Sequence, residues 1–241
     1  MPLKNSVGHM YHWVTHTHAH LGGECEHHCV YCYVDHPRFG RAPRYSGPIR
    51  LLEDEFRVKY DEKTLTRKGG VFPGTIFVEH MGDINGPSVT PEMKHRIIDH
   101  CRDYPANTYV LQSKNPRAFV DLVDILPRNC IIGTTIETNR DLIEIGDAPP
   151  PSERHEAMKL LDWPRTFVTI EPVLDFDVDV LAQWIADIAP EFLNLGADSK
   201  SHSLPEPSIE KIEALVAALA EHGIELREKH NLQRLRRKEA T

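Results

Sequence analysis

The chain has 241 residues, a net charge of -8 with histidine counted as neutral, and 40% hydrophobic residues. This length is enough for one large domain with a real core, so we predict a single domain over residues 1–241. The negative charge argues against a general polyanion binder, and no apolar run suits a secretion signal or a membrane span. We therefore expect a cytoplasmic protein without a membrane partner.

Short β-branched runs alternate with helical patterns along the chain, an order typical of a parallel sheet with crossover helices. The predicted strands cover residues 12–18, 75–81, 108–113, 130–138, 166–172, 192–198 and 224–229. The sequence therefore predicts an α/β barrel of six parallel strands, with room for a seventh after the last helix.

Two of the predicted helices have clear ends. The first begins after Thr90 as N-cap, with Pro91 in its first turn, and its apolar spacing predicts that Cys101 is a core residue. The second begins after Ser208 and stops before Gly223.

Two segments lie outside this alternation. Residues 36–74 are too long for an ordinary strand-to-helix connection and are predicted to be an elaborated active-site loop. The arginines and aromatic rings of this loop are Arg38, Phe39, Arg41, Arg44, Tyr45 and Arg50. They can bind a phosphate or stack on a base, which favours a nucleotide or nucleic-acid substrate. A solvated loop explains them equally well. Residues 230–241 are predicted to be a charged, solvated tail.

Polar residues follow nearly every predicted strand. In a parallel barrel the functional groups collect at the carboxyl ends of the strands, because the loops that follow the strands converge there. The candidates at these ends are His16, His18, His80, Asp83, Lys114, Glu137, Asn139, Glu171, Asn194 and Asp198.

Three of the five cysteines, Cys25, Cys29 and Cys32, lie in the stretch CEHHCVYC after the first predicted strand. In a reducing compartment this grouping indicates metal or cofactor chemistry rather than disulfides. Three thiolates at this spacing suit three irons of a cubic iron–sulfur cluster. Cys101, within a helix, and Cys130, at the amino end of a strand, are poorly placed to bind the fourth iron, which is left open for a small ligand.

The cysteine stretch resembles the C-x3-C-x2-C signature of the radical SAM superfamily, including the aromatic residue, Tyr31, before the last cysteine. The segments HMGD, LQSKNP, GTTIETN, TIEP and NLGAD are similar to a phage-associated branch of that superfamily of unknown function. The resemblance covers about residues 10–230. It implies a partial (βα)6 barrel of the TIM type, a [4Fe-4S] cluster on the three cysteines, and S-adenosyl-L-methionine (SAM) on the fourth iron.

The resemblance also implies cofactor-binding roles for residues at the first two strand ends. Tyr31 matches the position that contacts adenine through its backbone and ring. Gly82 and Asp83, in the stretch Met81-Gly82-Asp83, stand where the superfamily has Gly-Gly-Glu and binds the methionine amino group. Asp83 is one methylene shorter than glutamate but can accept the same hydrogen bonds.

Later strand ends match further SAM positions. Glu137 and Asn139 resemble the position that binds the ribose hydroxyls, and Glu171 and Asn194 resemble the later contacts, with Glu171 alternatively facing the substrate. Lys114 can neutralise either the methionine carboxylate or a substrate phosphate.

The reaction implied by the resemblance is reductive cleavage of SAM. An electron from a flavodoxin or ferredoxin enters the cluster and splits SAM into methionine and a 5'-deoxyadenosyl radical, which removes a hydrogen from the substrate. Cys25, Cys29 and Cys32 are thus both the metal ligands and the catalytic residues of the prediction.

A different class of function starts from the histidines. His16, His18 and His20 alternate at the strand period and would share one face. An HxH pair after a first strand resembles metal-dependent hydrolases, and three cysteines with a histidine form a common zinc set. The alternative is therefore a zinc-dependent hydrolase or a zinc-stabilised binding module, although no second histidine set on later strand ends completes a hydrolase site.

Overall fold

The computed structural model describes residues 3–8, 10–34, 43–200 and 202–238. By its internal contacts the chain divides into two compact units. The first contains residues 1–28, 32–113 and 121–132, and the second contains residues 29–31, 114–120 and 133–241. The predicted single domain over 1–241 stays a prediction.

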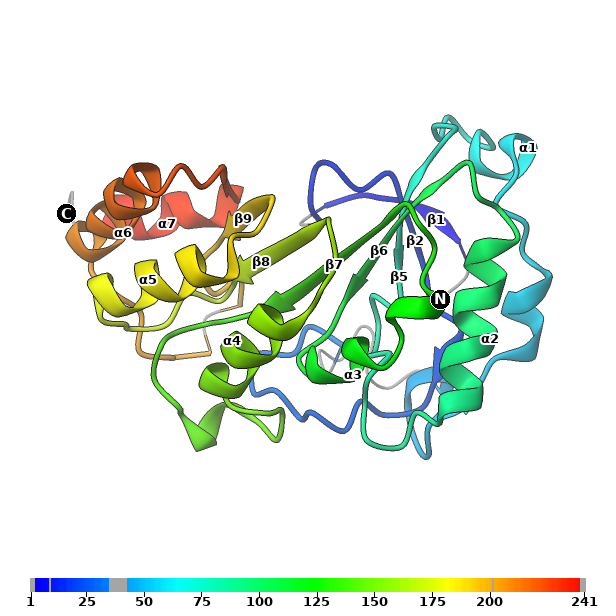
Figure 1. The fold of residues 1–241 in the computed structure, drawn as a ribbon, viewed down its shortest axis with the longest axis horizontal. Helices are drawn as coiled ribbons and strands as arrows, with labels where there is room; N and C mark the ends of the chain where they lie inside the picture. Colours follow the sequence, from blue (N-terminus) through cyan, green and yellow to red (C-terminus); the bar gives the residue numbers. More distant parts are fainter. Residues whose placement is uncertain (1–2, 9, 35–42, 201, 239–241) are drawn as a thin grey trace. The chain divides into compact units, whose positions relative to one another are not determined.

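One eight-stranded sheet runs through the fold in the order β1-β2-β5-β6-β7-β8-β9-β10 (Figure 1). The pairs β2–β5, β5–β6, β8–β9 and β9–β10 are parallel, and the short β1 is antiparallel to its neighbour β2. This mostly parallel α/β sheet confirms the predicted fold class of a partial TIM-type barrel, including the extra parallel strand β10.

The first unit contains the strands from β1 to β6 and the start of β7. The strand bounds are β1 Lys4–Asn5, β2 His16–His18, β3 Leu21–Gly22, β4 Arg50–Leu51, β5 Thr75–Val78, β6 Thr108–Gln112 and β7 Cys130–Thr135. The helical bounds are η1 Pro43–Tyr45, η2 Glu53–Arg57, α1 Glu62–Leu65, α2 Pro91–Arg102 and η3 Val123–Ile125. Helix α2 begins as predicted, because the Thr90 side chain accepts a hydrogen bond from the Met93 backbone N–H at 3.3 Å.

The second unit contains the rest of β7 and the elements that follow it, together with α3 Arg117–Val120. Its other helical bounds are η4 Ile143–Ile145, α4 Pro151–Leu160, α5 Val178–Ile188, α6 Ile209–Glu221, η5 His230–Leu232 and α7 Gln233–Lys238. Its strands are β8 Thr166–Ile170, β9 Phe192–Leu195 and β10 Leu226–Glu228. Helix α4 packs on α5, and α5 packs on α6 (Figure 1).

The hydrophobic core confirms the predictions for two cysteines. Cys101, on α2, is 2% exposed and Cys130, the first residue of β7, is 0% exposed. Helix α6 has Ser208 as its N-cap, and Gly223 follows its end with a φ of +72°, as the sequence predicted. No helix within the described residues has both the length and the apolar character to cross a membrane.

The structure differs from the sequence prediction mainly in the irregular segments. The described part of the 36–74 segment, from residue 43 on, contains the short elements η1, β4, η2 and α1, and its role as an active-site loop stays a prediction. Residues 35–42, which include Arg38, Phe39 and Arg41, lie outside the described residues. The predicted solvated tail instead forms η5 and α7, where Arg234 pairs with Glu206.

Candidate functional site

The chain enters the cysteine stretch through a close backbone crossing. β3 pairs antiparallel with β4, and the next residue, Gly23, has a φ of +98°. A Cβ atom on Gly23 would lie 2.4 Å from the carbonyl oxygen of Pro48, and one on Gly22 would lie 2.7 Å from that of Arg44. Only glycine fits both positions, so the pair fixes the path of the chain two residues before Cys25.

The three clustered cysteines are not in disulfides and are of intermediate exposure. Burial raises the pKa of the Cys29 thiol. Cys32 packs against a small apolar cluster in the first unit that consists of Ala19, Val34, Tyr45 and Met81. Three reduced, accessible thiols on one loop are the donor set that a [4Fe-4S] cluster takes from a protein, so the chemistry of these residues fits that group.

Among the described residues, no three or more histidine, cysteine, aspartate or glutamate side chains are arranged as a site for a metal ion.

Glu137 is the centre of a buried polar group in the second unit. Its Oε1 accepts hydrogen bonds from the Tyr31 hydroxyl and from Lys114 Nζ, and its Oε2 accepts one from Arg154 Nη1 at 2.8 Å. Lys114 also donates to the Tyr31 hydroxyl at 2.6 Å, and its Nζ lies 4.9 Å from the centre of the Tyr31 ring. Three predicted site residues, Tyr31, Lys114 and Glu137, are therefore brought together.

Two cations bond to the Glu137 carboxylate. Burial alone would raise the pKa of Glu137, but the charges of Lys114 and Arg154 outweigh it and hold that pKa at about 2. Burial, together with the Glu137 charge, raises the pKa of Tyr31 well above its usual value, so its hydroxyl stays neutral. The positive charge of Lys114 and Arg154 has the sign that attracts an anion such as a carboxylate, a phosphate or a thiolate.

Arg154 is a site residue that the sequence analysis missed. Its side chain is 2% exposed, and it also donates to the carbonyl oxygens of Thr135, at 2.9 Å, and Pro149, at 2.5 Å. An arginine in the first turn of α4, between glutamate and histidine, carries no signal in the sequence that distinguishes it from a solvated residue.

Asp83, after β5, lies in a second polar group, which belongs to the first unit. Its Oδ1 accepts from the Ser113 hydroxyl at 2.6 Å and from the Asn85 backbone N–H at 2.8 Å, and its Oδ2 accepts from His27 Nε2 at 2.9 Å. Asp83 is 8% exposed and His27 is 2% exposed. Beside Asp83, a Cβ atom on Gly82 would meet no heavy atom within 4 Å, so this turn borders open space.

His27 is the second residue that the sequence analysis missed. Its Nδ1 is buried and has no hydrogen-bond partner among the described residues. Because Nε2 donates to the Asp83 carboxylate, Nδ1 of the neutral ring is an acceptor. A histidine between two of the clustered cysteines was a visible signal, but its aspartate partner lies 56 positions away in the chain.

The other predicted strand-end residues have structural partners in the second unit. Asn139 bonds twice to Asp177: its Oδ1 accepts from the Asp177 backbone N–H at 2.7 Å, and its Nδ2 donates to the Asp177 carboxylate at 3.1 Å. Asn194, in β9, donates to the Thr169 hydroxyl at 3.3 Å. The structure does not bring Asn139 into the group around Glu137.

Glu171, after β8, is held by the C-terminal segment. Lys229 Nζ donates to its Oε2 at 2.6 Å, and Asn231 Nδ2 donates to its Oε1 at 2.9 Å. A Cβ atom on Gly196 would lie 2.9 Å from Glu171 Oε1, so a larger residue where β9 ends would displace the Glu171 side chain. These contacts tie Glu171 to the segment that the sequence predicted to be a solvated tail.

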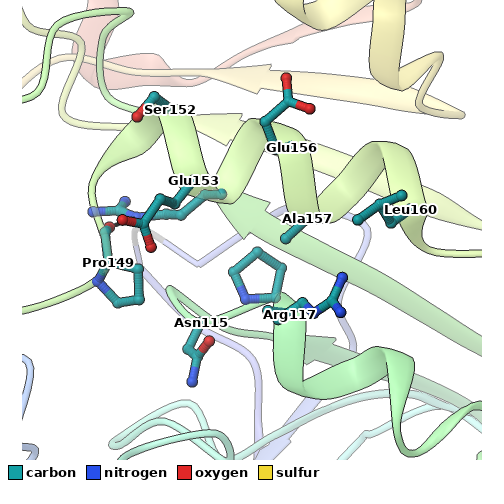
Figure 2. Close-up of a pocket in the computed structure, with 10 residues that line it drawn as sticks. Asn115, Arg117, Pro149, Ser152, Glu153, Glu156, Ala157 and Leu160 are labelled. Carbon is teal, nitrogen blue, oxygen red and sulfur yellow. Dashed lines mark hydrogen bonds between the residues drawn. The ribbon is translucent and has the colours of Figure 1, made fainter.

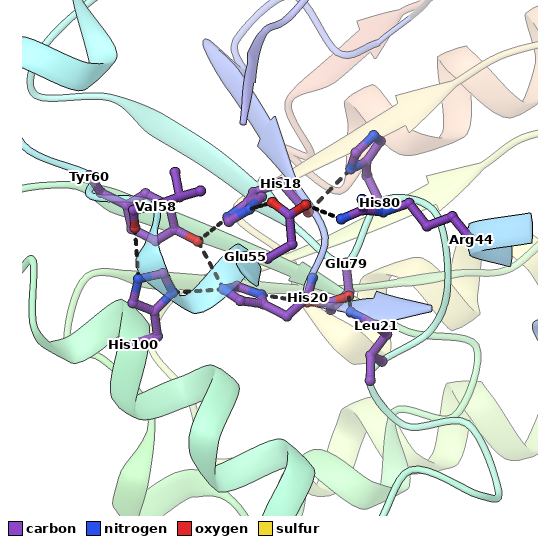
Figure 3. A network of polar contacts seen from close by, with 10 residues as sticks. All are labelled: His18, His20, Leu21, Arg44, Glu55, Val58, Tyr60, Glu79, His80 and His100. Atoms are coloured by element: carbon purple, nitrogen blue, oxygen red, sulfur yellow. Dashed lines mark hydrogen bonds and ion pairs between the residues drawn. The ribbon is translucent and has the colours of Figure 1, made fainter. Parts of the chain in front are cut away.

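The histidines of the first strand do not form the hydrolase-type pair considered from the sequence. His16, His18 and His20 are all buried. Figure 3 shows His18 and His20 beside Glu55, Tyr60 and His100. His16 Nε2 lies 3.0 Å from the carbonyl oxygen of Leu65, and His18 Nε2 lies 2.8 Å from Glu55 Oε2. His80 lies at the end of β5, where its Nδ1 lies 3.2 Å from the carbonyl oxygen of His18.

A surface pocket of about 400 Å³ lies in the second unit beside α4 (Figure 2). Asn115, Arg117, Ser152 and Glu153 line it together with apolar side chains such as Leu160. The Arg154 side chain also borders it, so the pocket lies next to the group around Glu137.

Several solved structures share this fold. A mutant of spore photoproduct lyase with bound AdoMet and dinucleoside spore photoproduct gives a TM-score of 0.54 at 13% identity, covering 89% of this chain and 64% of that one. Streptococcus suis SuiB bound to precursor peptide SuiA gives 0.65 at 8% identity, covering 92% and 50%. SuiB bound to S-adenosylmethionine gives 0.59 at 9% identity, covering 86% and 48%.

These neighbours are radical SAM enzymes, and at such identities the likeness shows a common fold. The chain spans between about half and two thirds of their length. No family model and no curated protein matches the sequence.

Proposed function

We propose that this chain is a radical SAM enzyme in which Cys25, Cys29 and Cys32 hold a [4Fe-4S] cluster and SAM binds the iron that they leave open. The observation that carries the proposal is the position of three reduced cysteines on the loop after β2 and β3, in a fold shared with enzymes solved with bound AdoMet. We also assign the chain to the phage-associated branch of the superfamily, on the basis of its strand-end segments.

When bound, the cluster and SAM supply a carbon radical for hydrogen abstraction, with the electron taken from a flavodoxin or ferredoxin. The residues of the chain bind and orient. Tyr31 is held through its hydroxyl by Glu137 and Lys114, so its ring and backbone are in place to border the adenine. The positive charge of Lys114 and Arg154 attracts the methionine carboxylate.

The methionine ammonium binds, in this proposal, at the pair formed by Asp83 and His27. The carboxylate already accepts three hydrogen bonds, so it is oriented and ionised before a ligand arrives. His27 Nδ1 is a buried acceptor that an N–H donor can reach without displacing those contacts. Gly82 adds open space beside Asp83. Glu137, Asn139, Glu171 and Asn194 keep their predicted cofactor roles as proposals.

For the substrate we propose a nucleotide or nucleic acid as the first class to test. Spore photoproduct lyase, which shares the fold, was solved with a dinucleoside photoproduct. The described arginines of the 36–74 loop do not add support. Arg44 pairs with Glu55, and Arg50 donates to backbone carbonyl oxygens, including that of Pro43 at 2.9 Å.

The proposal is tested with protein reconstituted with iron and sulfide without oxygen. Addition of SAM and dithionite should yield 5'-deoxyadenosine and methionine slowly, even without a substrate, and the yield should depend on Cys25, Cys29 and Cys32. A colourless protein with one bound zinc and no SAM cleavage would favour the zinc-dependent hydrolase or zinc-stabilised module instead. Nucleosides and short peptides then serve as separate substrate arms, because SuiB was solved with a peptide.

A further inference from the structure

Histidines and carboxylates form a continuous buried network in the first unit, which joins β2 to η2 and α2 (Figure 3). His18 Nδ1 lies 2.5 Å from the Tyr60 hydroxyl, and that hydroxyl lies 3.2 Å from His20 Nε2. His20 Nε2 lies 2.7 Å from His100 Nδ1. His18, His20 and Tyr60 are all 0% exposed, so water does not compete for these contacts.

One half of the network is balanced by an arginine. His18 Nε2 donates to the Glu55 carboxylate, and Arg44 forms an ion pair with the same carboxylate. Tyr60 donates its hydroxyl proton to His18 Nδ1, which completes the bonding of a neutral ring. Burial lowers the pKa of His18 to about 4, which agrees with a neutral His18.

The other half of the network, which contains His20 and His100, holds one proton more than two neutral histidine rings carry. His100 Nε2 lies 2.9 Å from the carbonyl oxygen of Val58, which only accepts, so this nitrogen is protonated. His20 Nδ1 lies 2.7 Å from the Glu79 carboxylate and donates to it. If both rings were neutral, His20 Nε2 and His100 Nδ1 would be two lone pairs 2.7 Å apart. A further proton must lie between them.

The same proton balances the charge of Glu79. The Glu79 side chain is 1% exposed, and among the described residues no lysine or arginine forms an ion pair with it. Burial alone would raise the pKa of Glu79, but hydrogen bonds from the His20 side chain and backbone and the charge of His20 lower it. An ionised carboxylate without a counter-charge is very costly in the interior. Protons on both His20 nitrogens make His20 and Glu79 an ion pair without net charge.

A metal ion fits this gap less well than a proton. Zinc bonds to histidine nitrogens at about 2.0–2.1 Å, so two ligand nitrogens of a tetrahedral site lie roughly 3.3 Å apart. The observed 2.7 Å between His20 Nε2 and His100 Nδ1 is a hydrogen-bond distance.

We propose that His20 is a positioning residue for the cysteine loop, that it carries protons on both ring nitrogens, and that its ion pair with Glu79 directs the chain from β2 toward Cys25. The role in the loop rests on the proposed function, whereas the protonation does not. The groups outside β2 that face His20 are Glu79 after β5, His100 on α2, Phe56 on η2, whose ring centre lies 4.8 Å away, and Tyr60 between η2 and α1, whose hydroxyl lies 3.2 Å from Nε2.

The geometry connects this ion pair to both candidate cofactor segments. The Glu79 carboxylate accepts from the backbone N–H of His20 at 2.8 Å and from that of Leu21 at 3.0 Å. Leu21 begins β3, which leads through Gly23 to Cys25. Glu79 has a φ of +60°, uncommon for a residue with a side chain, and the chain then continues into the turn of Gly82 and Asp83. One buried carboxylate therefore holds the ends of β2 and β5 in register.

The protonation is tested on the metal-free protein by 15N NMR of labelled histidine rings at pH 7.5, with His20 assigned through its loss in His20→Asn. Two protonated nitrogens on His20, with one each on His18 and His100, are expected. A single protonated nitrogen on His20 would overturn the proposal. The proposal would also be overturned if the wild-type protein co-purified with one equivalent of zinc and both His20→Asn and His100→Gln lacked that zinc.

The positioning role is tested with Glu79→Gln, which keeps the shape but removes the charge. Backbone amide hydrogen exchange at His20 and Leu21 should become about ten- to a hundred-fold faster, because charge-assisted hydrogen bonds are lost. Iron content after anaerobic reconstitution should fall in Glu79→Gln. It should fall less in His20→Asn, because the asparagine side chain retains a donor to Glu79.

His16→Gln is the matched control, because His16 is buried on the same strand face but bonds to Leu65 rather than to Glu79. It should leave the exchange at Leu21 and the iron content unchanged. Faster exchange in Glu79→Gln with an unchanged iron content would overturn the positioning role. If the wild-type protein binds no iron at all, the proposed function fails, while the NMR and exchange results still decide the protonation.

Discussion

Arg154 Nη1 lies 2.8 Å from Glu137 Oε2, and the two side chains are 2% and 0% exposed. This ion pair connects the start of α4 to the end of β7. Because Lys114 and Tyr31 bond to the other oxygen of Glu137, the pair also supports the group that we propose binds the methionine end and the adenine of SAM.

Replacing Arg154 by alanine should lower the free energy of unfolding by about 3 kcal/mol or more, because it removes one partner of a buried ion pair. Arg165→Ala is the matched control, since Arg165 pairs with Glu191 where both side chains are more than a third exposed. Its cost should stay below about 1 kcal/mol. Urea titration measures both, and equal losses would contradict the structural role of Arg154.

Alanine at Cys25, Cys29 or Cys32 should abolish the brown colour of anaerobically purified protein, because a cubic cluster needs all three thiolates. Cys101→Ala and Cys130→Ala should keep the colour at a modest cost in stability, because both side chains are buried in the core. Iron and sulfide analysis checks this, with about four of each per chain expected in the wild type. Loss of iron in the two core variants, with the fold intact, would count against the ligand assignment.

Asp83→Ala should weaken SAM binding by about ten- to a hundred-fold while the cluster remains, because a charge-assisted hydrogen bond contributes roughly 1.5–3 kcal/mol. Calorimetry on reconstituted protein measures the affinity. His27→Phe keeps a ring of similar shape but no acceptor and should weaken binding in the same direction. If Asp83→Ala folds and binds SAM normally, the ammonium lies elsewhere, and Glu137 is the next residue to test.

The stability of the protein should fall between pH 6.5 and about 4. Burial lowers the pKa values of His18 and His100 to about 4, whereas in the unfolded chain histidine titrates near 6.5. Below pH 6.5 the unfolded chain therefore binds protons that these folded side chains do not, and stability decreases until the pH reaches about 4. Each group contributes at most roughly 1.4 kcal/mol per pH unit.

Urea titrations across this pH range measure the effect. His100→Gln should reduce the slope of unfolding free energy against pH, because one titrating group is removed. His95→Gln, at an exposed position on the same helix, should leave the slope unchanged. The same slope in both variants would mean that the buried histidines do not cause the pH dependence.

The sequence by itself determined the elements whose signals are local. The parallel strands follow from β-branched runs, and helices α2 and α6 from the caps Thr90 and Ser208, because the bonds that form a cap join residues three apart. The cysteine spacing is also local, and it led to the cluster hypothesis before any fold was known. The runs overestimated strand length, since β2 starts only at His16, and they missed the short strands β1, β3 and β4.

Only the tertiary structure decided which partners the polar side chains have. Asn139 was matched to a cofactor position by the family resemblance, and only the fold shows that both of its polar atoms bond to Asp177, 38 positions along the chain. His20 was grouped with its neighbours as a metal-site candidate, yet its protons are placed by Glu79 and His100, 59 and 80 positions away. Periodicity shows which face of a strand a side chain occupies. It does not show what packs against that face, because burial and charge balance depend on residues that come together only when the chain folds.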